Sequence, residues 1–179
     1  IKDGATLSFH HHLRNGDYVL NMVFEEVKRR GIKDITLVAS SIFPCHEPII
    51  PLIKDGTIKN VIASYMSGPV AEAISHGDLK GTLVMQSHGG RARAIMEGSI
   101  KIDVVFIGAP STDIHGNISA TEGKAFCGTL GYAIADSIMA EKTVAITDTI
   151  LPLEGKTEIP SERIDYILKV DSIGDPNGI

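Results

Sequence analysis

The sequence predicts an α/β fold, with an open and mostly parallel sheet that carries helices on both faces. Short apolar runs alternate with segments of helical spacing along the chain, as in successive strand–helix units. The runs are apolar throughout, which is typical of strands buried on both faces of a parallel sheet. The 179 residues, 43% of them hydrophobic, are enough for a single α/β domain over 1–179 with its own core.

The first half of the chain contains four predicted strands with helices between them. Asp17 is suited to cap the first helix, and Gly31 to end it after the basic run 28–30. The continuous apolar character of 35–39 marks a buried strand. The expected strands are 5–9, 35–39, 61–63 and 83–85, and the expected helices are 18–30, 48–54 and 69–75.

The second half repeats the pattern with strands at 104–107, 144–146 and 166–170 and a helix at 132–140. We interpret the segment 152–160, rich in Pro, Glu and Lys, as a loop inside the domain. The chain begins at Ile1 rather than Met and stops after Ile179, so we expect it to be a piece of a longer polypeptide.

Composition excludes several classes of protein. The net charge of −5 and the lack of a Lys/Arg block argue against nucleic-acid binding. No apolar run reaches the roughly 20 residues that a membrane span requires. Cys45 and Cys127 lie far apart, and no secretory signal is present, so we expect reduced thiols in a cytoplasmic protein. We interpret Cys45 as a packing residue, because no local base would activate it.

The segment 87–93 (SHGGRAR) predicts an anion-binding junction. It directly follows the apolar run 83–85, which we interpret as a buried strand. Gly89 and Gly90 would let the backbone approach a ligand, and a helix N-terminus favours negative charge. Arg91 and Arg93 could clamp a carboxylate together if the turn is extended, whereas in a helix they would diverge by roughly 200°.

Three adjacent histidines, His10, His11 and His12, follow the first predicted strand. Because strand ends of one parallel sheet meet at a shared edge, we expect them to line the same crevice as the 87–93 junction. A metal site is disfavoured, since only His10 and His12 would converge on an extended chain and no carboxylate or cysteine stands at ligand spacing. We therefore expect no bound metal.

The loop 109–117 also follows a predicted buried strand. Asp113 and Asn117 in this loop either build a plain Asx-type turn or line the site. No GxGxxG with a downstream acid, no P-loop and no Gly-x-Ser-x-Gly elbow is present. These absences argue against a dinucleotide oxidoreductase, a P-loop enzyme and a serine hydrolase.

Several of these motifs resemble the coenzyme A transferases. The segments 3–6 (DGAT) and 102–104 (IDV), with the loop up to Asn117, look like that superfamily. The segments 8–12 (SFHHH), 87–93 and 174–176 (GDP) narrow the resemblance to the citrate lyase α subunits, across essentially the whole chain. Ordinary coenzyme A transferases have a Gly-Gly-Phe-type turn where this chain has its histidines.

The resemblance implies an acyl exchange. An acetyl thioester on the coenzyme-A-like arm of an acyl carrier (γ) subunit reacts with citrate, giving citryl thioester and acetate, and a lyase (β) subunit then cleaves the citryl thioester. It also implies an oligomeric complex, no cofactor bound by this chain, and low activity for this piece alone, because it would be the amino-terminal half of the subunit.

The candidate site residues combine the resemblance with the strand-end positions. Glycine N–H groups or a histidine would stabilise an oxyanion, and the arginines would hold carboxylates. The candidates are catalytic His11, His88, Gly89 and Gly90, and substrate-binding His10, His12, Arg14, Ser87, Arg91, Arg93, Asp113 and Asn117. Two rival hypotheses remain: a sugar-phosphate isomerase or sugar-phosphate-binding domain, and a non-catalytic domain that docks the carrier.

Overall fold

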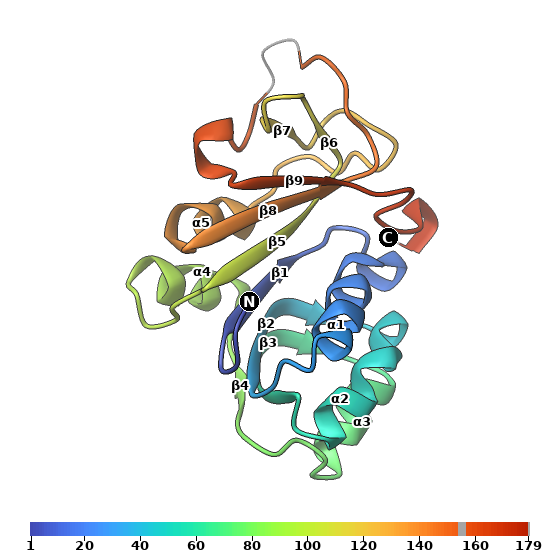
Figure 1. The fold of residues 1–179 in the computed structure, drawn as a ribbon, viewed down its shortest axis with the longest axis vertical. Coiled ribbons are helices and arrows are strands. Elements are labelled where there is room, and N and C mark those ends of the chain that lie inside the picture. The colour runs from blue at the N-terminus through green and yellow to red at the C-terminus, as the bar shows by residue number, and fades with distance from the viewer. Residues whose placement is uncertain (154–156, 179) are drawn as a thin grey trace.

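A seven-stranded sheet forms the centre of the computed structural model, which describes residues 1–153 and 157–178 (Figure 1). The strand order is β4-β3-β2-β1-β5-β8-β9, and all neighbouring strands are parallel. The predicted open parallel sheet is therefore confirmed. Its strands are β1 (Thr6–His10), β2 (Ile35–Ile42), β3 (Ile58–Met66), β4 (Leu83–Met85), β5 (Val104–Ala109), β8 (Lys142–Thr147) and β9 (Tyr166–Lys169).

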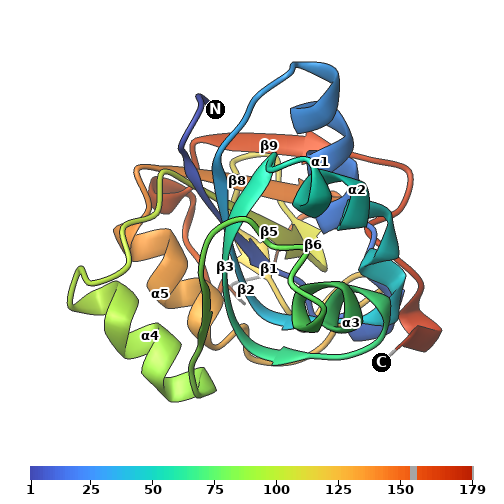
Figure 2. The same ribbon diagram turned by 90° about the horizontal axis from the view of Figure 1, so that it is seen from below.

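Helices cover both faces of this sheet (Figure 2). One face carries α1 (Val19–Arg29), α2 (Ile50–Lys54) and α3 (Pro69–Ser75), and the other carries α4 (His88–Met96) and α5 (Tyr132–Met139). A small antiparallel hairpin joins β6 (Ser111–Thr112) to β7 (Ile118–Ser119). Short 3₁₀ turns complete the fold: η1 (Arg14–Gly16), η2 (Pro44–Ile49), η3 (Ser161–Arg163) and η4 (Pro176–Gly178).

The order of the strands creates a switch point between β1 and β5. From β1 the chain adds β2, β3 and β4 in one direction, and it then crosses back to add β5, β8 and β9 on the other side (Figure 1). Connections that leave neighbouring strands in opposite directions open a crevice at the carboxyl ends of the strands. The segment that follows β1, with its histidines, lies at this point.

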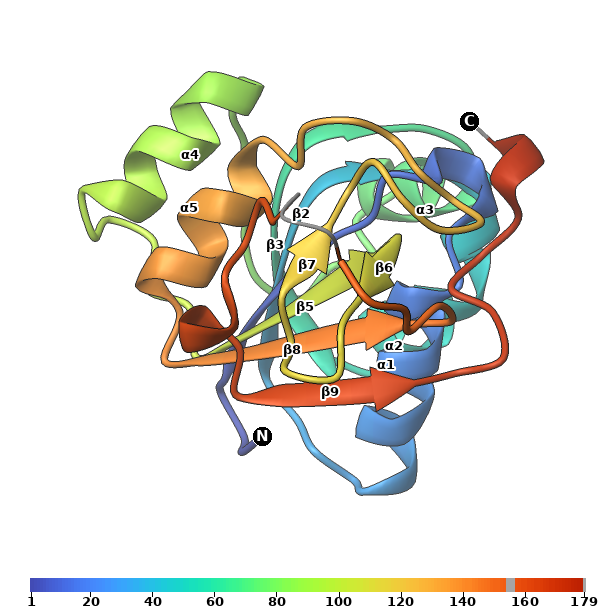
Figure 3. The same ribbon diagram turned by 90° about the horizontal axis from the view of Figure 1, so that it is seen from above.

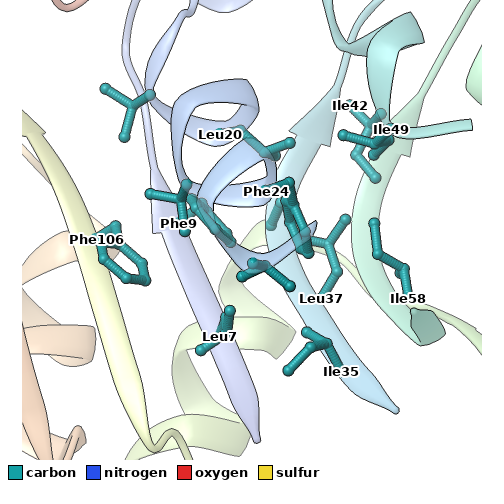
Figure 4. Close-up of a cluster of buried hydrophobic side chains, with 14 of the residues drawn as sticks. Leu7, Phe9, Leu20, Phe24, Ile35, Leu37, Ile42, Ile49, Ile58 and Phe106 are labelled. Atoms are coloured by element: carbon teal, nitrogen blue, oxygen red, sulfur yellow. The ribbon is translucent and has the colours of Figure 1, made fainter. Parts of the chain in front are cut away.

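Stacked aromatic rings hold the core on the α1 side (Figure 4). The ring centroids of Phe9 and Phe24 are 5.5 Å apart, and those of Phe9 and Phe106 are 5.4 Å apart. Phe9 and Phe106 come from the adjacent strands β1 and β5, whereas Phe24 comes from α1. This stack therefore fixes the helix against the strands that flank the switch point.

The predicted limits of the first helix are confirmed in physical terms. The Asp17 carboxylate accepts hydrogen bonds from the N–H groups of Val19 and Leu20, each at 3.1 Å. At the other end Gly31 adopts a φ of 67°, the left-handed conformation that closes helices. Five buried apolar residues lie on the inward face of α1, which gives it a continuous apolar stripe.

Three predictions need correction or completion. The strand 83–85 is an edge strand, and Met85 is 51% exposed, so it is not the buried strand that we expected. The predicted helix 48–54 is instead a 3₁₀ turn followed by the short α2. Part of the predicted loop 152–160, residues 154–156, lies outside the described residues.

Among the described residues, no helix has the length and apolar character needed to cross a membrane.

We predict that Phe24→Ala lowers the free energy of unfolding by about 3–5 kcal/mol, because it empties a position that is only 1% exposed in the aromatic stack. Ile114→Ala is the control, since Ile114 is 78% exposed and should change stability by less than about 0.5 kcal/mol. Urea unfolding curves would measure both variants. Equal costs for the two would contradict this description of the core.

Candidate functional site

A cavity of about 980 Å³ lies at the carboxyl ends of the strands near the switch point, and we call it the strand-end cavity. It is lined by the carboxyl ends of β1, β2 and β3 and the residues just after β1 and β2, by the segment before α5, and by the first residues of α4 and α5. The lining residues are Phe9, His10, His11, His12, Arg14, Ser40, Ser41, Phe43, Tyr65, His88, Thr121, Phe126, Cys127, Gly128, Thr129, Leu130, Gly131 and Tyr132.

The cavity has a floor and a cover that come from distant parts of the sequence. The strand ends of β1, β2 and β3 form the floor. The segment between β7 and α5, drawn yellow to orange, arches over this side of the molecule in Figure 3. The first residues of α4 and α5 also reach the cavity: the ring centroids of His88 and Tyr132 lie 6.0 Å apart. Two helix N-termini, each with a partial positive charge, therefore flank one space.

Arg14 is the one arginine or lysine among the described lining residues, and these include no aspartate or glutamate. Its side chain is exposed, and the described residues offer it no ion-pair partner. Arg14 also has a φ of 50°, a left-handed conformation that is costly for a residue with a side chain. Backbone strain of this kind concentrates at functional sites. Arg14 thus lies at the cavity, and its role in binding substrate stays a prediction.

The structure brings His10, His11 and His12 together on the wall of the cavity, as predicted. Burial lowers the pKa of His10 to about 3, with the neighbouring His11 as a further cause. Burial likewise lowers the pKa of His11 and of His12. All three rings are consequently neutral at pH 7, and they contribute dipoles rather than charge.

A hydrogen bond limits the chemistry of His11. Its Nε2 lies 3.1 Å from the carbonyl oxygen of Ser41, which can only accept, so Nε2 carries the ring hydrogen. The neutral ring then presents Nδ1 as an acceptor. An N–H of His11 was one of the alternative donors considered for an oxyanion, and this contact leaves the neutral ring no N–H for that purpose.

His46 and Asp17 form a buried pair behind His11 that sequence reasoning did not identify. The Nδ1 of His46 accepts the N–H of Phe43 at 3.0 Å, so its Nε2 carries the hydrogen and donates to Asp17 at 3.2 Å. Burial raises the pKa of Asp17, but the nearby His11 and the hydrogen bond from His46 outweigh it, so the pKa lies below its usual value. The partners are 29 positions apart in the sequence, so no local pattern indicates their contact.

This pair bears on metal binding, because His11, Asp17 and His46 each place one potential ligand atom within 4.8 Å of the others. A metal would need a lone pair on Nε2 of His46, which holds the ring hydrogen while Nδ1 accepts from an amide. Asp17 is also occupied by two N–H groups of α1. The hydrogen bonds therefore argue against a metal site here, and the absence of a metal stays a prediction.

The structure corrects the predicted role of Arg91. Its side chain is completely buried and pairs with the equally buried Asp136 at 2.9 Å. It also donates to Ser8 at 2.6 Å and to Ser40 at 3.1 Å, and its guanidinium carbon lies 4.9 Å from the centroid of the Tyr132 ring. Arg91 does not line the cavity, and its guanidinium is taken up by the pair with Asp136.

Of the two arrangements that the sequence left open for Arg91 and Arg93, the structure adopts the helical one, in which they cannot share an anion. α4 begins at His88, so the two arginines lie two residues apart on a helix and diverge. Arg93 is exposed and pairs with Glu97 at 2.6 Å. The signal was present in the sequence, because Ser87 is a strong N-cap residue that starts the helix before the glycines.

The glycine turn is part of this helix rather than an open anion loop. The N–H of Gly90 donates to the Ser87 hydroxyl at 3.0 Å, so it is already used in capping. Ser87, Gly89 and Gly90 do not line the cavity, whereas His88 does. The rival hypothesis of a sugar phosphate on this turn loses its basis with them.

Asp113 and Asn117 build a turn away from the strand-end cavity, which corrects their assignment to the site. Asp113 accepts hydrogen bonds from the N–H groups of His115 and Asn117, both at 2.9 Å, and from the Asn117 side chain at 2.7 Å. Neither residue lines the cavity. The plain Asx-turn alternative is the one that the structure adopts, between β6 and β7.

Cys45 and Cys127 are free thiols, and Cys127 lines the cavity. Burial raises the pKa of each to about 11. At pH 7 both are therefore protonated, and neither is primed as a nucleophile.

Comparisons with known proteins were consistent with one another. The family described as citrate lyase, alpha subunit (CitF) matches residues 1–179. The chain is 42% identical to the citrate lyase alpha chain of Escherichia coli K12, over 98% of this chain and 34% of that protein. It is 40% identical to the alpha chain of Haemophilus influenzae, over 100% of this chain and 36% of the relative. The chain thus spans about a third of the length of these curated relatives.

The chain is also similar to solved structures. A structure described as the alpha subunit of citrate lyase from Streptococcus mutans, in complex with citrate, is 50% identical with a TM-score of 0.95, over 100% of this chain and 35% of that one. The glutaconate coenzyme A-transferase of Acidaminococcus fermentans has a TM-score of 0.67 at 16% identity, over 94% of this chain and 71% of the other. The latter shows a shared fold alone, which agrees with the predicted coenzyme A transferase-like domain.

We predict that Asp136→Ala lowers the free energy of unfolding by about 3–5 kcal/mol, because it leaves the Arg91 charge buried without a partner. Glu97→Ala is the control. It breaks the exposed ion pair between Glu97 and Arg93, an arginine of the same helix as Arg91, and should lower the free energy of unfolding by less than about 1 kcal/mol. The double variant Arg91→Met/Asp136→Leu should recover part of the loss. Denaturant titrations that gave the two single variants equal stability would contradict a buried pair.

A second prediction follows from the neutral histidines. The unfolded chain binds a proton at His10 near pH 6.5, whereas the folded chain does not until about pH 3, so stability must fall as the pH drops through this window. Between pH 7 and pH 5 His10 alone should cost about 2 kcal/mol. His10→Gln should reduce this pH dependence, and His115→Gln, at an exposed position, should not. Equal slopes in both variants would show that His10 titrates normally.

Proposed function

The chain belongs to the citrate lyase alpha subunit family, and we propose that it forms part of the site where an acetyl thioester exchanges its acyl group with citrate. The observation that carries this proposal is the strand-end cavity, which combines one unpaired arginine with neutral donors and acceptors and has no carboxylate among its described lining residues. Such a lining suits an anionic substrate. The citrate complex of the related Streptococcus mutans protein supports citrate as that anion.

The proposed exchange has two steps. A citrate carboxylate oxygen attacks the thioester carbonyl, which forms a C–O bond, breaks the C–S bond and releases a thiolate. The thiolate then attacks the citryl carbonyl of the resulting mixed anhydride and expels acetate. Both steps pass through an oxyanion, and neither needs an oxidant or a net proton transfer. Preorganised dipoles are therefore worth more to this reaction than an acid–base pair.

The residues of the cavity suit these steps. Arg14 would hold a carboxylate in a planar, two-point contact. The N-cap residue Gly131 and the first residue of α5, Tyr132, line the cavity, so the N-terminus of this helix offers a positive dipole end to a developing oxyanion. His88 at the start of α4 supplies a second polar group at the same place. His10 and His12 remain neutral neighbours that add no competing charge.

The remaining components of the reaction follow from the family. We infer that the thioester arrives on the coenzyme-A-like arm of an acyl carrier (γ) subunit, that a β subunit cleaves the citryl product, and that the complex is oligomeric and cytoplasmic. The chain itself would bind no cofactor. Residues 1–179 alone should exchange acyl groups far more slowly than the complete subunit, because water would compete for donors in an open cavity.

Formation of citryl-CoA from acetyl-CoA and citrate by the complete alpha subunit tests the proposed activity. We expect acetate release that depends on citrate and no comparable reaction with sugar phosphates. A complete, folded subunit that binds acetyl-CoA and citrate without exchange would favour a role in docking the carrier.

We predict that Arg14→Asn weakens citrate binding roughly tenfold to a hundredfold, because it removes a charge-assisted contact. Folding should not suffer, since asparagine tolerates the left-handed backbone of this position. Isothermal titration with citrate would measure the affinity, and thermal unfolding would measure the stability. Arg93→Asn is the matched control, because Arg93 lies outside the cavity. Unchanged citrate affinity in Arg14→Asn would remove this residue from the site.

A further inference from the structure

Two large aromatic side chains are exposed at the rim of the strand-end cavity. Phe126, in the covering segment, is 67% exposed, and Tyr65, at the end of β3, is 47% exposed. Exposed aromatic rings that gather around one cavity are unfavourable in water and mark a binding surface for apolar groups. Neither ring carries a positive charge with which to hold a carboxylate.

A row of rings connects this rim to the floor. The ring centroids of Tyr65 and Phe43 are 5.6 Å apart, and those of Phe43 and His11 are 6.3 Å apart. Tyr65 lies near the end of β3, and Phe43 and His11 directly follow the neighbouring strands β2 and β1, so the row runs along the carboxyl ends of the sheet. Phe43 and His11 are half-buried, whereas Tyr65 is open to solvent. The row therefore leads inward from the surface.

The row is chemically unlike the part of the cavity around Arg14. Citrate carries carboxylates that need cations and hydrogen-bond donors, and the faces of aromatic rings are electron-rich. A linear, uncharged chain with methylene groups would gain from the same rings by burying apolar surface. The volume of about 980 Å³ is at the upper end for pockets that hold drug-sized ligands, so it leaves space for a second substrate beside a small acid.

We propose that the row Tyr65–Phe43–His11, with Phe126 across the rim, binds the linear arm of the acyl thioester and guides its carbonyl to the floor. At the floor, citrate held by Arg14 would approach the thioester carbonyl. This inference rests on the proposed function and adds to it the path of the second substrate. An arm attached to a carrier protein must enter from the rim, and the row begins at the rim.

Three acetyl thioesters with arms of increasing length test the path in the complete alpha subunit: S-acetyl-N-acetylcysteamine, S-acetylpantetheine and acetyl-CoA. In Tyr65→Ala and in Phe126→Ala we expect the KM for the two longer thioesters to rise about three- to tenfold, the range of one lost aromatic contact. The KM for the shortest thioester and the KM for citrate should stay unchanged. Both positions are exposed, so the substitutions leave the core intact.

Tyr166→Ala is the matched control, because Tyr166 is 58% exposed on the edge strand β9 and lies outside the cavity. The inference is overturned if no thioester is affected. It is also overturned if the KM rises for acetyl-CoA alone, because Tyr65 would then contact the nucleotide part of coenzyme A. A KM that rises equally for all three thioesters would overturn it too, because the substitution would then have distorted the floor of the cavity.

Equilibrium binding of S-acetylpantetheine separates this inference from the proposed function. A wild-type subunit that binds it more tightly than Tyr65→Ala supports the path even if no acyl exchange to citrate occurs, in which case the proposed function alone fails. Exchange with equal S-acetylpantetheine affinity in both proteins would leave the function standing and reject the path.

Discussion

The buried ion pair of Arg91 and Asp136 joins the elements on which the strand-end cavity depends. Arg91 comes from α4 and Asp136 from α5, and the guanidinium also reaches Ser8 on β1 and Ser40 on β2. Removing two charges from water is costly, and the cost is met only when the geometry satisfies both groups. The pair therefore restricts how the two helices approach the sheet. The start of α5 and the Tyr132 ring at the cavity take their positions from it.

Much of the fold was predictable because the signals are local. Apolar runs identified the seven strands of the main sheet, and Asp17 and Gly31 identified the limits of α1 through capping chemistry that operates within a few residues. The edge position of β4 was not predictable in this way. A short apolar run such as 83–85 has the same composition whether one or both of its sides are paired, and pairing is decided by topology.

The site was predictable in position but not in detail. The shared edge of a parallel sheet placed the histidines of β1 at a cavity, as expected. The role of Arg91 was not evident, because Asp136 follows it by 45 residues and no local pattern records the contact. The Asp17–His46 pair was missed for the same reason. For α4 the reason differs: two glycines suggested an open loop, although Ser87 already indicated a cap.

The electrostatics of the cavity suit the proposed acyl exchange, which would proceed without a pair of catalytic carboxylates. A thiolate is a good leaving group, so the reaction needs stabilisation of an oxyanion more than protonation of the departing sulfur. If the histidines of the cavity wall were protonated, they would repel the charge of Arg14. They would also offer an anion several competing positive sites, so its orientation would be less well defined. Burial keeps His10, His11 and His12 neutral, and Arg14 remains the one arginine or lysine among the described lining residues. In the proposed exchange a single charge at one side would orient a carboxylate, and the uncharged part of the lining would accommodate an uncharged thioester.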